Sequence, residues 1–219
     1  MKKFIVTGTP RSGTTFLCKQ IASLDNVVMY EDWDYEPFGG YGGVLDESEY
    51  LRQLESDHPD KIVGLKAFWQ DSFLMDNHIR KFHPIVLIRK DIQKVYLSLI
   101  VLMRKGYDET KSSRRRPGVE SIEYSDFGLS YMANTLLKTY YYSEKMPKFF
   151  KLYFEDLLPG NTTLDTYFEN KINLDTGYIE SELTDYHPDP ERFLSILKRT
   201  ALGMDHKKLP EYVRENLDI

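Results

Sequence analysis

The stretch Lys3 to Ser23, KFIVTGTPRSGTTFLCKQIAS, decides the fold of this chain. It opens with the apolar run Phe4-Ile5-Val6, which predicts a buried strand. A turn rich in Gly, Pro and Ser follows at 8–15, and the apolar spacing after it predicts a helix. A strand, a glycine loop and a helix N-terminus together bind phosphate groups, because the loop amides and the positive end of the helix dipole face an anion. We therefore expect this loop to hold a phosphate.

The loop departs from the P-loop pattern G-x-x-x-x-G-K-[ST] at one informative position. Gly8 and Gly13 match the two glycines, and Thr15 matches the final Ser or Thr. Thr14 stands where the pattern has its lysine, and a cation appears earlier in the loop, at Arg11. The P-loop lysine serves the β- and γ-phosphates of a triphosphate. Its absence argues against ATP or GTP hydrolysis, and the retained glycines argue for another phosphate-bearing donor.

The string TPRSGTTFL at 9–17 resembles the loop of the PAPS-dependent sulfotransferases, whose pattern is [TYL]-P-[KR]-S-G-[TS]-[TS]-[WFL]-[LV]. These enzymes bind the 5′-phosphosulfate of 3′-phosphoadenosine-5′-phosphosulfate (PAPS). The resemblance implies that Arg11 stabilises charge on the transferred sulfonate, and that Phe16 replaces the family's usual Trp beside the adenine. It also implies a set of four residues around the 5′-phosphate: Ser12, Gly13, Thr14 and Thr15.

Composition limits the classes of function that the chain can have. It has 219 residues, 41% of them hydrophobic and 29% charged, which is typical of a soluble globular protein. The formal net charge of −5 disfavours a general nucleic-acid binder. Cys18 is the only cysteine, so no internal disulfide forms, which suits a reducing compartment. No run of 18 apolar residues predicts a membrane span, and within the family the lack of an anchor implies a cytoplasmic enzyme.

A lysine interrupts the apolar segment Lys61 to Trp69, which we predict to be the third strand. Burying an ammonium group is costly, and an anion close to Lys66 would offset the cost. Sulfotransferases are similar in having a lysine on this strand that neutralises the sulfonate. In the soluble animal enzymes a catalytic His follows two residues later, where this chain has Phe68.

Pro84 to Arg89 is predicted to be the fourth strand, and Lys90 to Lys105 the helix after it, with Asp91 as its N-cap. Arg89 would then stand at the end of a strand, where a guanidinium suits a phosphate dianion. The pair Arg89 and Ser98 resembles the family's second signature, which binds the 3′-phosphate. Its R-K-D sequence and spacing look closer to bacterial glycolipid- and trehalose-type enzymes than to animal cytosolic ones.

Two glutamates follow the predicted strand Asn26 to Tyr30. Bacterial sulfotransferases of the glycolipid type resemble this chain in having a Glu just past the second strand, which acts as general base. Because this chain has Phe68 where the animal enzymes have the catalytic His, a glutamate is favoured as the general base. Either Glu31 or Glu36 fits, and the sequence leaves both open.

Lys148 to Leu158 is predicted to be the last core strand, ending in Phe-Glu-Asp-Leu. This ending resembles the family's Tyr-Glu-Asp-Leu, which implies that Phe154 contacts adenine. On the preceding helix, Asp126 to Lys145, we expect the tyrosines 140–142 to be partly buried at the surface. In the C-terminal part, the residues that could replace the family's closing segment are Arg192, Lys198 and Arg199.

Together these patterns predict a single α/β domain over residues 1–219, with a P-loop NTPase-like central parallel sheet of four to five strands flanked by helices. The resemblance implies a sulfotransferase that moves a sulfonate from PAPS to a hydroxyl, or as second choice an amine, and releases adenosine 3′,5′-bisphosphate. The acceptor would be a small molecule, glycan or lipid. No metal is expected, since the five histidines lack metal-ligand spacing. Two alternatives stay open: a P-loop kinase of a small molecule, and a non-catalytic nucleotide-binding module.

The two candidate bases can be separated by substitution. We expect either Glu31→Gln or Glu36→Gln to lower the rate of sulfonate transfer by about 100-fold or more, because one positioned general base contributes on that scale. Donor affinity should be kept, since a base for the acceptor does not hold the donor. Transfer rates and donor Kd for both variants check this, and two variants with wild-type rates would refute both assignments.

Overall fold

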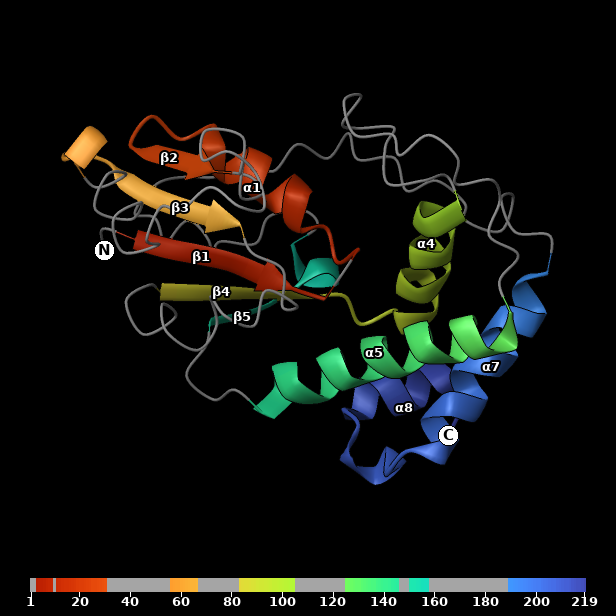
Figure 1. The fold of residues 1–219 in the computed structure, drawn as a ribbon. Helices are drawn as coiled ribbons and strands as arrows, with labels where there is room; N and C mark the ends of the chain where they lie inside the picture. Colours follow the sequence, from red (N-terminus) through yellow and green to blue (C-terminus); the bar gives the residue numbers. More distant parts are fainter. Residues whose placement is uncertain are drawn as a thin grey trace. The chain divides into compact units, whose positions relative to one another are not determined.

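The computed structural model of the chain describes residues 3–9, 11–30, 56–66, 83–104, 125–145, 150–157 and 189–219. Five strands, five α-helices and two 3-10 helices lie in these ranges (Figure 1). They are β1 (Lys3–Gly8), α1 (Thr14–Ala22), β2 (Val27–Tyr30), β3 (Ile62–Lys66), β4 (His83–Ile88), α4 (Ile92–Arg104), α5 (Asp126–Lys145), β5 (Phe150–Tyr153), η2 (Phe154–Asp156), α7 (Pro190–Gly203), η4 (His206–Lys208) and α8 (Glu211–Leu217).

The five described strands form one parallel sheet in the order β2-β3-β1-β4-β5 (Figure 1). β1 is the central strand and pairs with β3, where Val6 is level with Lys66, and with β4, where Gly8 is level with Leu87. The chain proceeds from β1 to one side of the sheet and then returns to the other, so the strand order reverses beside β1. Ligands of such sheets bind at the carboxyl ends of the strands at this reversal. The predicted α/β fold class with a parallel sheet is confirmed.

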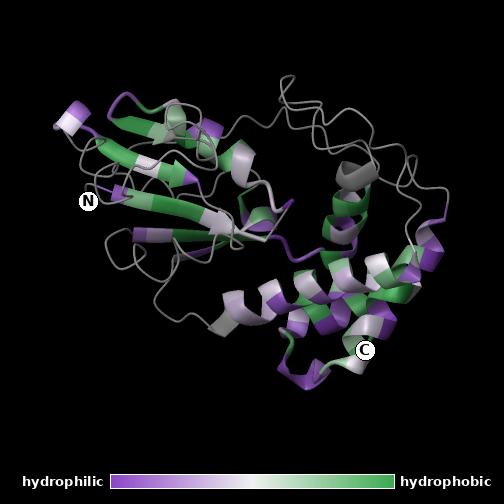
Figure 2. Cartoon of the chain, in the orientation of Figure 1, coloured by the Kyte–Doolittle hydropathy of each residue, from purple (hydrophilic) through white to green (hydrophobic). Residues whose placement is uncertain are grey.

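The core explains why the first apolar run forms the central strand. Phe4 and Val6 are completely buried, and the intervening Ile5 is 1% exposed, so both faces of β1 are covered. Strands of parallel sheets are buried on both faces and are therefore largely apolar, and Figure 2 shows the middle of β1 in the green of hydrophobic residues. Leu17 and Ile21 project from α1 into the cluster that contains Phe4 and Val6. Packing on this cluster fixes the helix that follows the glycine loop.

The described elements fall into two compact units. One contains the sheet with α1 and η2, and the other contains α4, α5, α7, η4 and α8 together with the short segment Thr9–Arg11. The boundary therefore crosses the glycine loop between Arg11 and Ser12, and it also falls between β4 and Arg89. The prediction that residues 1–219 form a single domain stays a prediction.

Side-chain caps define where two helices of the second unit begin. Asp91 accepts a hydrogen bond from the amide of Lys94 at 3.0 Å, as the sequence predicts for the start of α4. Asp189 caps α7 in the same way, accepting from the amide of Arg192 at 3.0 Å, and Pro190 occupies the first turn. Both aspartates satisfy helix amides that lack intrahelical partners.

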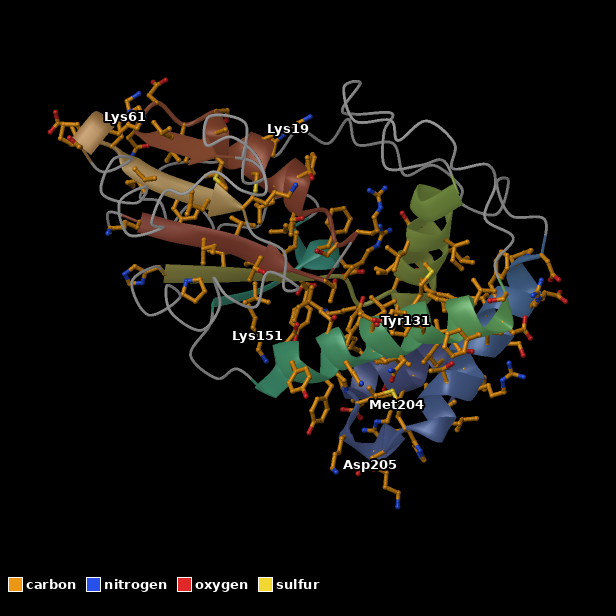
Figure 3. The ribbon with its side chains drawn as sticks, viewed as in Figure 1. Lys19, Lys61, Tyr131, Lys151, Met204 and Asp205 are labelled. Carbon is orange, nitrogen blue, oxygen red and sulfur yellow. The ribbon has the colours of Figure 1, made fainter. Side chains whose placement is uncertain are left out.

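Surface ion pairs involve the basic residues of the C-terminal helices. Arg192 contacts Asp126 of α5 at 2.5 Å, and this hydrogen bond holds the pKa of the Asp126 carboxyl below its ordinary value. Lys198 lies 3.4 Å from Asp218, and next to η4 the labelled Asp205 pairs with Lys208 at 2.6 Å (Figure 3). All three pairs are solvent-exposed, so each contributes little to stability.

The structure corrects two predictions about aromatic residues. The last strand is shorter than predicted: β5 ends at Tyr153, and Phe154 begins a 3-10 turn that leads its ring into the core. In the tyrosine run, Tyr142 is 49% exposed and Tyr141 is half-buried, but Tyr140 is completely buried. Tyr140 continues the buried stripe of α5, which includes Ala133 and Leu136, and this spacing is the signal that predicts its burial.

Gly64 provides a test of the packing in the sheet. It lies level with Phe4 on β1 and Met29 on β2, whose side chains fill the space above it. A Cβ at this position would lie 2.6 Å from the sulfur of Met29 and closer still to the ring of Phe4. We expect Gly64→Ala to lower the free energy of unfolding by about 1–3 kcal/mol, because overpacking displaces both side chains.

Gly203→Ala is the control for this substitution, since a Cβ there has no heavy atom within 4 Å. Urea unfolding should show it within about 0.5 kcal/mol of wild type or slightly more stable. Equal effects of the two substitutions would contradict the packing described for Gly64.

Candidate functional site

The glycine loop between β1 and α1 contains two constrained backbone positions. A Cβ on Gly8 would meet the carbonyl oxygen of Leu87 on β4 and would lie 3.1 Å from the Ser12 hydroxyl, so only glycine fits. Arg11 adopts φ 62°, in the left-handed region that non-glycine residues rarely enter. Such conformations cost free energy and are concentrated at functional sites. The loop therefore holds Arg11 in a conformation that the surrounding structure must stabilise.

The first turn of α1 meets the requirements of an anion-binding helix terminus. Gly13 is its N-cap at φ 92° and provides no side-chain cap, and no acidic residue lies in the first turn. No carboxylate of this first turn therefore neutralises the positive end of the helix dipole. Ser12, which precedes the cap, is completely buried, and its hydroxyl has no hydrogen-bond partner in the part of the chain that the structure describes. A first turn without a side-chain cap or an acidic residue, preceded by a buried hydroxyl, suits a bound phosphate group.

Phe154 packs directly beneath Gly13. A Cβ built on Gly13 would lie 2.6 Å and 2.7 Å from two carbons of the Phe154 ring. The same ring meets Phe16 of α1 edge to face, with centroids 6.5 Å apart, and is itself only 3% exposed. Phe154 therefore supports the loop from the core side, while Phe16 is partly exposed. That either ring contacts adenine stays a prediction.

Lys66 brings a cation to the loop from the end of β3. Its side chain is buried, with 4% of the residue exposed, and its ammonium nitrogen donates a hydrogen bond to the Thr15 hydroxyl at 2.8 Å. Thr15 is exposed on the first turn of α1, whereas Thr14, in the position of the P-loop lysine, is 7% exposed. Lys66 thus brings a second positive charge to the loop from a neighbouring strand, in addition to Arg11 within the loop.

Arg11 and Ser98 are joined by a hydrogen bond within the second unit. The Nε of Arg11 donates to the Ser98 hydroxyl at 2.9 Å, and Ser98 is 8% exposed on α4. The resemblance to sulfotransferases predicts that these two residues lie at opposite ends of one donor molecule. The bond holds the Arg11 side chain beside α4. Arg11, which is predicted to act on the sulfonate, therefore contacts Ser98, which is predicted to bind the 3′-phosphate.

Arg89 follows β4 and is 6% exposed. Amides in the first turn of the next helix, α4, already have partners: Ile92 donates to the carbonyl of Lys90 at 2.9 Å, and Lys94 donates to Asp91. Gln93 donates to the side-chain oxygen of Asn216 at 3.2 Å. Unlike the first turn of α1, the start of α4 has little capacity to bind an anion through its amides. A phosphate near this turn would depend on the side chains of Arg89 and Ser98.

The structure brings the predicted residues together in two sets, one in each unit. In the sheet unit, Lys66 contacts Thr15, and Phe154 contacts both Gly13 and Phe16. The second unit holds Arg11, Ser98 and Arg89. Glu31 and Glu36 lie outside the described residues.

Two contributors were not predicted from the sequence. Tyr140 donates a hydrogen bond to the carbonyl of Arg89, and Asn216 caps Gln93. Both contacts join segments that are distant in the chain. In the described ranges no cluster of His, Cys, Asp or Glu could hold a metal ion, and none of the helices is long and apolar enough to cross a bilayer.

Comparison with known proteins supports the fold. No family model matches the sequence, and no curated protein matches it. Among solved structures, the chain is similar to that of mouse sulfotransferase SULT7A1 complexed with PAP, with a TM-score of 0.56. The match covers 97% of this chain and 89% of the mouse chain at 10% sequence identity. At this identity the likeness shows a shared fold.

Gly13 tests the support that Phe154 gives to the loop. We expect Gly13→Ala to lower the free energy of unfolding by about 2–4 kcal/mol, because the new methyl group meets Phe154 and the left-handed backbone disfavours alanine. Phe154→Leu in the same chain should recover about 1 kcal/mol of that loss, since it removes part of the overlap.

A double-mutant cycle in urea measures the coupling between the two positions. Gly128→Ala is the control, because a Cβ there lies at an ordinary 3.6 Å from Ser125. Strictly additive losses for Gly13→Ala and Phe154→Leu would show that the ring does not contact the loop.

Proposed function

We propose that this protein is a sulfotransferase that moves a sulfonate group from PAPS to an acceptor hydroxyl and releases adenosine 3′,5′-bisphosphate. The observation that carries the proposal is the 2.8 Å hydrogen bond from the buried Lys66 ammonium to Thr15. Lys66 thereby brings a cation to the loop, although the loop itself lacks the lysine that triphosphate chemistry uses. The shared fold with a sulfotransferase that was solved with PAP supports the same assignment.

In this proposal the loop binds the 5′ end of the donor. The amides at the start of α1 and the loop residues surround the 5′-phosphate: Ser12, Gly13, Thr14 and Thr15. Arg11 and Lys66 stabilise the negative charge that develops on the sulfonate and on the bridging oxygen, in the manner of preorganised donors. No acidic side chain in the first turn of α1 opposes them.

The 3′-phosphate is assigned to Arg89 and Ser98. A forked guanidinium and a hydroxyl together provide several donors to one phosphate. The Arg11–Ser98 hydrogen bond of 2.9 Å supports the assignment of Ser98 to the donor, because it joins two of the proposed donor ligands within the second unit. The adenine is assigned to Phe16, whose ring is partly exposed, with Phe154 behind it.

The chemical step proposed is an in-line displacement at sulfur. The acceptor oxygen forms a bond to sulfur while the bond from sulfur to the bridging oxygen breaks, and that oxygen leaves on the 5′-phosphate. The proton of the acceptor hydroxyl passes to a general base, for which Glu31 and Glu36 are the candidates. A small molecule, a glycan or a lipid remains the proposed class of acceptor.

The two rival functions make different demands on the loop. A kinase of the P-loop class needs a lysine at position 14, where this chain has a buried threonine. A non-catalytic module would bind the nucleotide but transfer nothing. The closeness to bacterial glycolipid-type enzymes and the cytoplasmic location stay predictions from the sequence.

Calorimetric titration tests the proposal. We expect adenosine 3′,5′-bisphosphate to bind without Mg²⁺, and ATP to bind weakly. Arg89→Ala should weaken binding of the bisphosphate by about 10- to 100-fold, because a charged hydrogen bond contributes about 1.5–3 kcal/mol. The affinity for adenosine 5′-phosphate should stay unchanged. Lys94→Ala, which removes an exposed cation one turn further along, should change neither affinity. Tight Mg²⁺-dependent ATP binding would refute the sulfotransferase assignment, and equal losses for both nucleotides would refute the role of Arg89.

A further inference from the structure

The turn from β4 into α4, residues 89–93, is held by two helices that are distant in sequence. Arg89 is the first residue of this turn, and its side chain is the proposed ligand of the 3′-phosphate. An arginine binds a phosphate through two parallel hydrogen bonds only when its fork is correctly placed. The backbone of the turn determines where the fork begins, so contacts to this backbone influence phosphate binding.

Tyr140 of α5 fixes the first residue of the turn. Its hydroxyl donates a hydrogen bond of 2.6 Å to the carbonyl oxygen of Arg89, and both groups are buried. The Tyr140 ring also contacts Tyr212 of α8, with centroids 6.2 Å apart at 59°. A buried phenol held in this way has little freedom, so the carbonyl that it binds is held in one position.

Asn216 of α8 fixes the other end of the turn. Its side-chain oxygen accepts a hydrogen bond of 3.2 Å from the amide of Gln93, and its carbonyl oxygen accepts one from the Gln93 side chain. Gln93 is the second residue of α4. The amide of a residue at this position has no partner within its own helix. Asn216 thus caps a helix to which it does not belong.

We propose that Tyr140 and Asn216 are positioning residues that preset the Arg89 turn for a 3′-phosphate. This inference rests on the proposed function. A turn that is fixed before the ligand arrives avoids the cost of ordering the arginine during binding, so more of the interaction appears as affinity. The C-terminal helix α8 then contributes to donor selectivity through the backbone of α4, although its residues are not assigned to the donor.

Tyr140→Phe tests the inference, because it removes the hydroxyl and keeps the ring. The measured quantity is the preference for adenosine 3′,5′-bisphosphate over adenosine 5′-phosphate, taken as the ratio of their Kd values. We expect this preference to fall by about 3- to 10-fold, the scale of one lost hydrogen bond. Asn216→Ala should reduce the preference in the same direction.

Tyr96→Phe is the matched control. The Tyr96 hydroxyl is also buried and donates to a backbone carbonyl, that of Leu129, at 3.0 Å. Both substitutions should lower Tm to a similar extent. Only Tyr140→Phe should lower the preference for the bisphosphate, and only it should speed hydrogen exchange at the amides of 89–93 in the ligand-free protein.

The two readouts separate failure of this inference from failure of the proposed function. If Tyr140→Phe changes neither the nucleotide preference nor the exchange at 89–93, the positioning role is overturned. If the wild-type protein shows no preference for the bisphosphate, the proposed function fails, and exchange alone then decides the positioning role. Faster exchange in Tyr140→Phe but not in Tyr96→Phe supports it, and equal exchange in both overturns it.

Discussion

A buried ammonium beside the glycine loop is the interaction on which the proposed chemistry depends. Lys66 lies at the end of β3, level with Val6 in the central strand, and donates to Thr15 at the start of α1. A charge removed from water in this way is costly unless hydrogen bonds and negative charge compensate it. A phosphate or sulfonate on the loop would add a favourable charge interaction to the hydrogen bond that Lys66 already makes. The parallel register of β1 and β3 therefore determines where an anion is favoured in a protein whose formal net charge is −5.

The two helix N-termini next to the predicted phosphate residues differ in a way that assigns them different roles. α1 begins at a glycine without a side-chain cap, which leaves the dipole of the helix to act on a ligand. α4 begins with its amides bound to Asp91 and Asn216. The first terminus suits binding through the backbone, and the second suits binding through side chains whose backbone is fixed.

Local patterns in the sequence predicted most of the sheet. The run Phe4-Ile5-Val6, the buried Lys66 and the cap Asp91 were all readable, because each depends on neighbours along the chain. Contacts between segments that are distant in the chain could not be predicted from the sequence. Nothing near Arg89 indicates that Tyr140, 51 residues later, binds its carbonyl. Likewise, Phe154 was interpreted from its neighbours alone, whereas its packing beneath Gly13 depends on the turn after β5.

The most direct test of the central claim is a crystal structure of the protein with adenosine 3′,5′-bisphosphate. We predict that the 5′-phosphate lies on the amides of residues 12–15, within hydrogen-bond distance of the Lys66 ammonium. We also predict that the 3′-phosphate lies on the guanidinium of Arg89 and the hydroxyl of Ser98. A bisphosphate bound with its 5′-phosphate away from the loop, or with the 3′-phosphate in solvent, would refute the proposed binding of the donor.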